Sequence, residues 1–143
     1  MRHTFLPLTG ALIALIACDG GPTQPPLHGE IYVLESIAGV SLPAPYAPNP
    51  EFSERIVADT FAFVDGESGI RRTKYEGDAE VLDEEFSYST SGESISITFG
   101  CPINALCIAG PHLTGTRTNA SIIITHSVVT RQPLALRRLF PPD

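Results

Sequence analysis

The chain has 143 residues, 17% of them charged, and a net charge of −7 at pH 7. This length suits a single domain of ordinary size with its own hydrophobic core. An acidic protein repels the phosphate backbone of nucleic acids, so we do not expect nucleic-acid binding. The sequence contains neither a glycine-rich phosphate loop nor a dinucleotide-binding fingerprint, and we expect no cofactor.

The N-terminal region has the layout of a secretory signal peptide. A positively charged start, Met1-Arg2-His3, precedes an almost wholly apolar stretch over residues 5–17. This stretch is shorter than the roughly 20 apolar residues that a membrane-spanning helix needs, and its length is typical of a signal sequence. We therefore predict that residues 1–17 are a signal peptide.

The apolar stretch ends in Leu15-Ile16-Ala17-Cys18. These four residues resemble the lipobox of bacterial lipoproteins, in which the cysteine receives a diacylglycerol and, after signal removal, a fatty acid such as palmitate on its new amine. The resemblance implies that Cys18 is lipidated and that the protein is anchored to a membrane of the cell envelope, outside the cytoplasm. Two or more acyl chains hold a protein stably on a membrane, whereas one does not.

Residues 18–28 are rich in glycine, proline and small polar residues. This composition is typical of a flexible or extended linker, because it offers little apolar surface to bury. We predict a lipidated tether over residues 18–28 and one folded domain over residues 29–140. Loss of Arg2 with the signal leaves 8 basic and 16 acidic residues in the mature protein.

From Glu30 onward the chain has the pattern of successive short β-strands. Isoleucine, valine, threonine and serine are common, and turn signals such as Asp65-Gly66 separate the apolar segments. The proline-rich segment 42–54 is predicted to be a long loop. The expected strands cover residues 30–37, 55–64, 69–77, 86–90, 95–99, 112–118, 121–128 and 134–139.

The segment 86–99 has the clearest alternation of apolar and polar residues. On both sides of the turn at Ser91-Gly92, every second residue is apolar, which places one set of side chains on each face of a hairpin. Sequential hairpins favour an all-β fold, namely an antiparallel up-and-down barrel or curved meander of about eight strands, because closure removes exposed edges. A β-sandwich is the alternative. The bulky residues expected inside are Tyr32, Leu34, Phe61, Phe63, Phe86, Tyr88, Ile95, Ile97 and Phe99.

A second resemblance involves the start of the domain. Tyr32, Leu34, Gly39, Leu42-Pro43 and the later Asp65-Gly66 turn are similar in type and spacing to the opening of uncharacterised small bacterial lipoproteins with lipocalin-like barrels. The match covers about the first half of the domain. It implies the barrel fold and no particular chemistry.

Cys101 and Cys107 flank the short segment Pro-Ile-Asn-Ala-Leu. Because the envelope is oxidising and two cysteines remain once Cys18 is lipidated, we predict a disulfide between them. Such a bridge stabilises the fold by about 2 kcal/mol in the chain-entropy view. The alternative is a metal site made of both thiolates with His112 and His126, although the spacing of the cysteines is wider than in common zinc sites.

We expect no enzymatic activity. Serine occurs in neither a Gly-x-Ser-x-Gly nor a Ser-x-x-Lys motif, so no nucleophile stands out. The carboxylates within residues 78–85 are predicted to form a solvated acidic loop, and the basic run 71–74 to pair with that loop or lie against lipid headgroups. An envelope hydrolase with a site near His112 and His126 is the alternative.

The sequence thus predicts a membrane-anchored envelope lipoprotein that serves as a binding or structural module. Its expected partners are the membrane, through the lipid on Cys18, and either a small apolar ligand or another envelope protein. A barrel of eight strands can hold one small ligand or be filled by its own side chains. The state of the barrel interior therefore decides between these partners.

Overall fold

The computed structural model describes residues 24, 26–46, 54–101, 110–127 and 132–139. This part of the chain contains ten β-strands and no helix, and hence no helix able to cross a membrane. The strands are β1 (Ile31–Ile37), β2 (Val40–Ser41), β3 (Ala44–Pro45), β4 (Arg55–Phe63), β5 (Ser68–Tyr75), β6 (Leu82–Ser91), β7 (Ser94–Phe99), β8 (His112–Arg117), β9 (Ser121–Ser127) and β10 (Leu134–Arg138).

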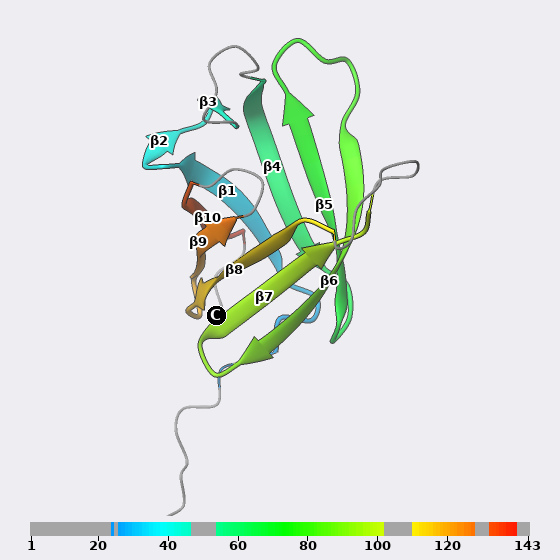
Figure 1. The fold of residues 1–143 in the computed structure, drawn as a ribbon, viewed down its shortest axis with the longest axis vertical. Coiled ribbons are helices and arrows are strands. Elements are labelled where there is room, and N and C mark those ends of the chain that lie inside the picture. The colour runs from blue at the N-terminus through cyan, green and yellow to red at the C-terminus, as the bar shows by residue number, and fades with distance from the viewer. Residues whose placement is uncertain (1–23, 25, 47–53, 102–109, 128–131, 140–143) are drawn as a thin grey trace, which may run out of the picture.

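Eight of these strands form a closed antiparallel barrel (Figure 1). From β4 to β10 each strand pairs with the next one in the chain, and β1 closes the ring by pairing with both β4 and β10. Tyr32 on β1 lies opposite Phe61 on one side and opposite Arg138 on the other. The expected up-and-down topology is confirmed, and its closure leaves the barrel wall without a long open edge.

Two details differ from the sequence-based expectation. The proline-rich segment 42–54 is not wholly a loop, because the two-residue strand β3 within it pairs with the start of β4. Just before this segment, the two-residue strand β2 pairs with the end of β1. The acidic segment is also shorter than expected as a loop, since β6 begins at Leu82 and carries Asp83 and Glu84. These two carboxylates lie directly opposite Arg72 and Arg71 on β5, and the cross-strand ion pairs extend the hairpin.

The barrel interior is filled by the side chains that alternation assigned to it. All nine bulky residues expected inside are buried. Phe63 contacts Tyr88 and Phe86 edge-on, with ring centroids 4.8 Å and 5.4 Å apart, and Phe86 contacts Phe99 at 5.8 Å. Gly69 faces these rings, and a Cβ there would lie 2.2 Å from the Phe86 ring. The aromatic cluster therefore occupies the space that a side chain at residue 69 would need.

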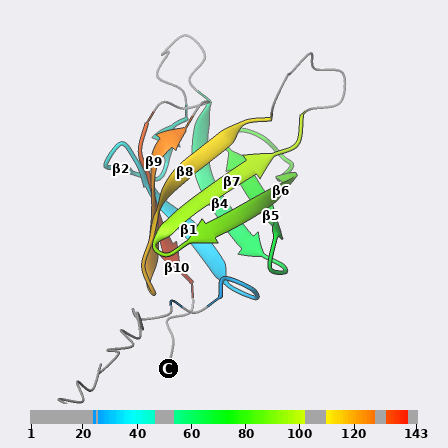
Figure 2. The same cartoon turned by 60° about the horizontal axis from the view of Figure 1, so that its bottom comes forward.

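The N-terminal segment covers one end of the barrel, called the base here (Figures 1 and 2). Leu27 is buried within the hydrophobic core, and the Gln24 side-chain amide donates a hydrogen bond to the Arg117 carbonyl at 3.2 Å. The amide of Gly29 donates to the Phe63 carbonyl at 2.8 Å. Contact between this segment and the barrel therefore begins before residue 29.

The motif residues of the second resemblance have clear structural roles. Tyr32 and Leu34 are buried on β1, and Gly39 has a φ of 80° in the turn from β1 to β2, a conformation that glycine adopts readily. In the turn from β4 to β5, Asp65 accepts hydrogen bonds from the amides of Glu67 and Ser68. The structure is a small all-β barrel of eight strands, as in a lipocalin-like domain.

Candidate functional site

A buried ion pair lies inside the barrel, toward the end opposite the base. Asp59 on β4 and Arg71 on β5 face inward, with side chains 0% and 5% exposed. The Arg71 Nη2 donates to Asp59 Oδ2 at 2.7 Å, and its Nε donates to both carboxylate oxygens at 3.0 and 3.1 Å. Thr73 adds a hydroxyl hydrogen bond to Oδ1 at 3.2 Å. The pair therefore has the two-pronged geometry that binds guanidinium and carboxylate most strongly.

Strand register produces this arrangement. Phe61 lies directly opposite Arg71, and Asp59 directly opposite Thr73, so the two charged side chains are diagonal neighbours on the inner face. The remaining Arg71 nitrogen, Nη1, points toward the rim, where it donates to the Tyr46 hydroxyl at 3.2 Å. It also lies 3.5 Å from Oε2 of Glu84, whose side chain is 38% exposed.

Aromatic rings enclose the guanidinium. Its central carbon lies 5.3 Å from the ring centroids of Tyr46 and Phe61 and 5.6 Å from that of Phe99. A planar cation over ring faces gains favourable electrostatic energy, more so where water is excluded. Burial by itself would lower the pKa of Arg71, but the carboxylate of Asp59 raises it above the ordinary value. Arg71 therefore stays protonated inside the barrel.

The ion pair is arranged for holding strands together rather than for reacting. Both oxygens of Asp59 accept hydrogen bonds, and Arg71 reaches partners on β4, on β6 and in the segment after β3. A saturated charged network of this kind fixes a unique arrangement of the strands that contribute to it. Beside it, burial raises the pKa of Tyr75 to about 12, so its phenol stays neutral at physiological pH.

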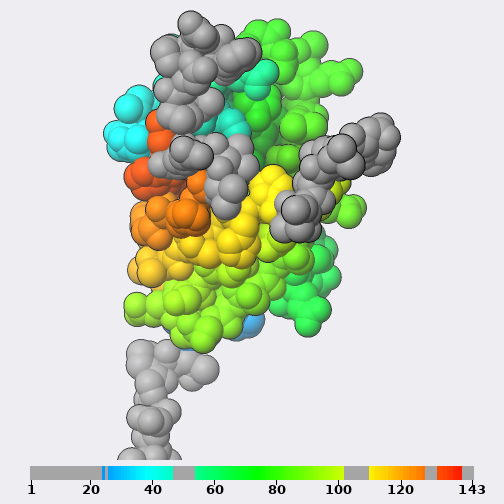
Figure 3. Space-filling model, viewed as in Figure 1, coloured from blue at the N-terminus to red at the C-terminus, as the bar shows by residue number. Residues whose placement is uncertain are grey.

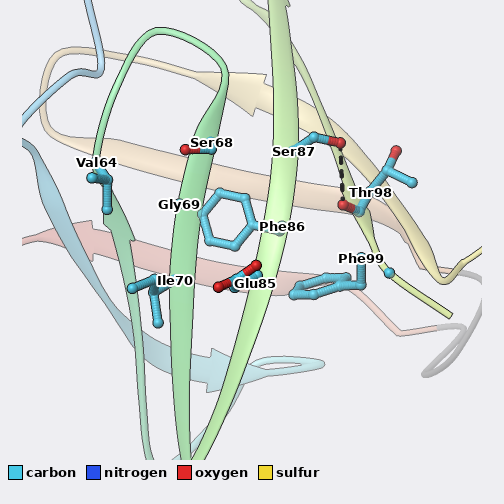
Figure 4. A pocket seen from close by; sticks show the side chains of 10 residues that line it. Val64, Ser68, Gly69, Ile70, Glu85, Phe86, Ser87, Thr98 and Phe99 are labelled. Atoms are coloured by element: carbon cyan, nitrogen blue, oxygen red, sulfur yellow. Dashed lines mark hydrogen bonds between the residues drawn. The ribbon is translucent and has the colours of Figure 1, made fainter. Parts of the chain in front are cut away.

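A second candidate is an open groove on the outer wall across β5, β6 and β7 (Figure 4). Its volume is about 570 Å³, and its lining is mainly apolar. Val64, 52% exposed, borders one end, while Glu85 is the one charged side chain among the lining residues. The residues that line it are Val64, Ser68, Gly69, Ile70, Glu85, Phe86, Ser87, Thr98, Phe99 and Gly100.

The groove can accept an apolar group with few polar contacts. Ser87 donates its hydroxyl to the Thr98 carbonyl at 3.4 Å, so part of its hydrogen-bonding capacity is already used. Gly100 contributes no side chain, and a Cβ there would meet no atom within 4 Å, which helps to leave that part of the groove open. Such a surface suits an aliphatic or aromatic side chain of a partner, or a small apolar molecule.

The two histidines of the hydrolase and metal hypotheses lie on the outer wall. His112 on β8 contacts the Thr98 hydroxyl at 2.9 Å through Nδ1 and the Ser96 hydroxyl at 3.3 Å through Nε2. His126 on β9 is exposed and pairs with Thr114 in the register of β8 and β9. Among the described residues, no group of three or more His, Cys, Asp or Glu side chains could hold a metal ion.

The predicted cysteine sites fall mostly outside the described residues. Cys18 and Cys107 are both beyond the described ranges, and Cys101 is exposed directly after β7. The lipidation of Cys18 and the pairing of Cys101 with Cys107 therefore stay predictions. A thiol count on the denatured, unreduced mature protein tests the pairing, and two free thiols would exclude it.

Sequence reasoning missed the buried ion pair, although its signal was present. Asp59 has the same strand parity as Phe61 and Phe63, which places a carboxylate on the inner face. Arg71 likewise shares the parity of Gly69, which faces the aromatic cluster. A charge at an inward position requires a partner there, and that requirement could have linked the two residues.

No protein family matches this chain, and no curated protein or solved structure matches it significantly.

Proposed function

We propose that the protein is a lipid-anchored protein of the cell envelope whose barrel is a non-enzymatic docking module. The observation that carries this proposal is the filled interior, with the aromatic cluster and the Asp59–Arg71 pair buried inside the wall. A barrel filled by its own side chains has little room for an internal ligand. A partner would then bind to the outer surface, where the groove across β5, β6 and β7 is open to solvent.

The position of the N-terminal segment supports the anchoring part of the proposal. Gln24, Leu27 and Gly29 contact the base, so an anchor on the residues that precede Gln24 would hold the domain by that end. Residues 18–23 can span at most about 20 Å when fully extended. A lipid on Cys18 would keep the base close to the membrane surface and leave the opposite end of the barrel accessible.

The placement of the histidines favours docking over hydrolysis. His112 is hydrogen-bonded to two hydroxyl groups on the outer wall, and neither Ser96 nor Thr98 belongs to a nucleophile motif. A hydrolase needs a nucleophile, a base and an oxyanion site converging on one position. The hydrolase therefore remains the weaker alternative.

Mass spectrometry of the protein purified from membranes tests the anchor. We expect a mass corresponding to cleavage before Cys18 and addition of acyl chains, and we expect the Cys18→Ser variant to leave the membrane fraction. An unmodified thiol at residue 18 or a retained leader would refute the anchor. A fluorescent fatty acid tests the filled interior, since tight, saturable one-to-one binding that Phe63→Ala alters would contradict it.

A further inference from the structure

A second groove lies at the end of the barrel opposite the base, beside the β5–β6 hairpin. Its volume is about 370 Å³. Figure 3 shows this hairpin, in green, near the upper end of the molecule, away from the N-terminal segment. The groove is lined by Glu54, Tyr75, Asp78, Glu80, Val81 and Leu82. We call this surface the rim groove.

The basic side chains near the rim groove are already engaged. Arg55 pairs with Glu76 at 3.2 Å, and Arg72 pairs with Asp83 at 3.3 Å. Lys74 donates from Nζ to the backbone carbonyls of residues 78 and 80, which fixes the hairpin. Its positive charge offsets part of the negative charge there, but it forms no ion pair with the carboxylates of these two residues. None of these three cations forms an ion pair with a carboxylate that lines the groove.

Three carboxylates remain there without a basic partner among the described residues. Glu54, Asp78 and Glu80 are exposed, and none forms an ion pair in this part of the chain. They do not converge on one point, since no group of three such side chains is placed to hold a metal ion in the described ranges. Spread negative charge of this kind complements several cationic groups along a chain better than it complements one ion.

Two aliphatic side chains lie beside this charge. Val81 is 53% exposed and Leu82 is 48% exposed, although valine and leucine are usually found in protein interiors. Both border the rim groove together with Tyr75, which is half-buried. Adjacent apolar and acidic surface matches a peptide that carries lysine or arginine next to an aliphatic residue.

We propose that the rim groove binds a basic segment of an envelope protein, in which lysine or arginine side chains flank one or two aliphatic residues. The cationic groups contact Glu54, Asp78 and Glu80, and the aliphatic residues cover Val81 and Leu82. This inference goes beyond the proposed function, because it adds a second docking surface to the groove across β5, β6 and β7. It rests on the proposed function only in placing this surface at the end that faces away from the anchored base.

Fluorescence anisotropy with the labelled peptide Lys-Lys-Leu-Val-Lys-Lys tests the assignment. The full-length protein, purified in nonionic detergent, is titrated at low ionic strength, with empty micelles as the blank. We expect saturable binding that weakens as salt is added. We also expect Glu54→Gln/Asp78→Asn/Glu80→Gln to weaken binding at least tenfold, and Val81→Ser/Leu82→Ser to weaken it about fivefold, because each exposed contact contributes modestly.

A charge-matched control separates the groove from the overall acidity. Glu35→Gln/Glu67→Gln/Glu93→Gln removes the same net charge at exposed positions that line neither groove, and we expect its affinity to stay within threefold of the wild type. Equal losses in the two triple variants would overturn the assignment, as would an absence of binding by the wild type. Circular dichroism verifies that the variants are folded, and methyl NMR shifts of Val81 and Leu82 on titration give a mutation-free test.

The same preparation distinguishes failure of this inference from failure of the proposed function. Peptide binding by a protein whose Cys18 is unmodified would overturn the lipid anchor and support the rim groove. A lipidated protein that does not bind the peptide would overturn the rim groove alone.

Discussion

The buried pair of Asp59 and Arg71 makes the fold sensitive to a single charge. Replacing Asp59 with asparagine removes the carboxylate while keeping the size of the side chain, and it leaves the guanidinium inside the barrel with only the partly exposed Glu84 nearby. Removal of one partner from a buried ion pair costs about 3–5 kcal/mol. For a domain of this size, that corresponds to a fall in melting temperature of about 12–20 °C.

Urea denaturation followed by circular dichroism measures the effect. We expect Asp59→Asn and Arg71→Met each to lower the free energy of unfolding by about 3 kcal/mol or more. The double variant Asp59→Leu/Arg71→Met removes both charges, so its loss should be smaller than the sum of the single losses by at least about 2 kcal/mol. Single losses below about 1 kcal/mol, or strictly additive losses, would show that the pair is not the strong buried contact described.

Three further predictions concern packing and titration. Gly69→Ala should destabilise the barrel by about 1–3 kcal/mol, because the new Cβ would overlap the Phe86 ring. The control Gly66→Ala should change stability by less than about 0.5 kcal/mol, because no atom lies within 4 Å of its new Cβ. Equal urea midpoints for the two variants would contradict this prediction. Tyr75 has a pKa raised to about 12 by burial, so the folded protein keeps a proton that the unfolded chain loses near pH 10. Stability should therefore fall between about pH 10 and 12, and Tyr75→Phe should make that fall shallower; an unchanged slope would refute the cause. The Ser68 side chain and two turn amides donate to Asp65 and lower its pKa below 3.8, so its stabilising effect is present above about pH 4 and lost as the pH falls through its folded pKa. An NMR titration of its carboxyl carbon with a midpoint at or above 3.8 would contradict this reading.

The existence of the strands could be predicted because burial of one face of a strand makes apolar residues recur at every second position of the sequence. The alternation in 86–99 and turn signals such as Asp65-Gly66 helped to place seven of the eight barrel strands within about two residues of their bounds. The exception is β6, which begins at Leu82, whereas the predicted strand begins at Phe86. Asp83 and Glu84 have the composition of a solvated loop, and only their ion pairs with β5 explain why they belong to a strand.

Register was harder to predict than strand existence. A two-residue turn at Asp65-Gly66 would place Asp59 opposite Arg72, whereas the three-residue turn 65–67 places it opposite Thr73. That difference of one residue decides whether Arg72 lies directly opposite Asp59 or Arg71 lies diagonal to it on the inner face. The rim groove could not be predicted for a similar reason. Its side chains come from β5, from β6, from the turn between them and from Glu54 just before β4, and no local sequence pattern shows that these residues lie close together.

The closure of the barrel between its first and last strands affects how the protein is made. Glu30 and Arg138, which pair at this seam, are 108 residues apart in the chain. Until β10 has emerged during synthesis, β1 and β9 each keep an unpaired side that can hydrogen-bond to other chains. Contacts between such distant segments form slowly. The nascent polypeptide is therefore most prone to aggregation just before its last strand is synthesised. A chain truncated before Leu134 would keep the unpaired edges of β1 and β9 permanently.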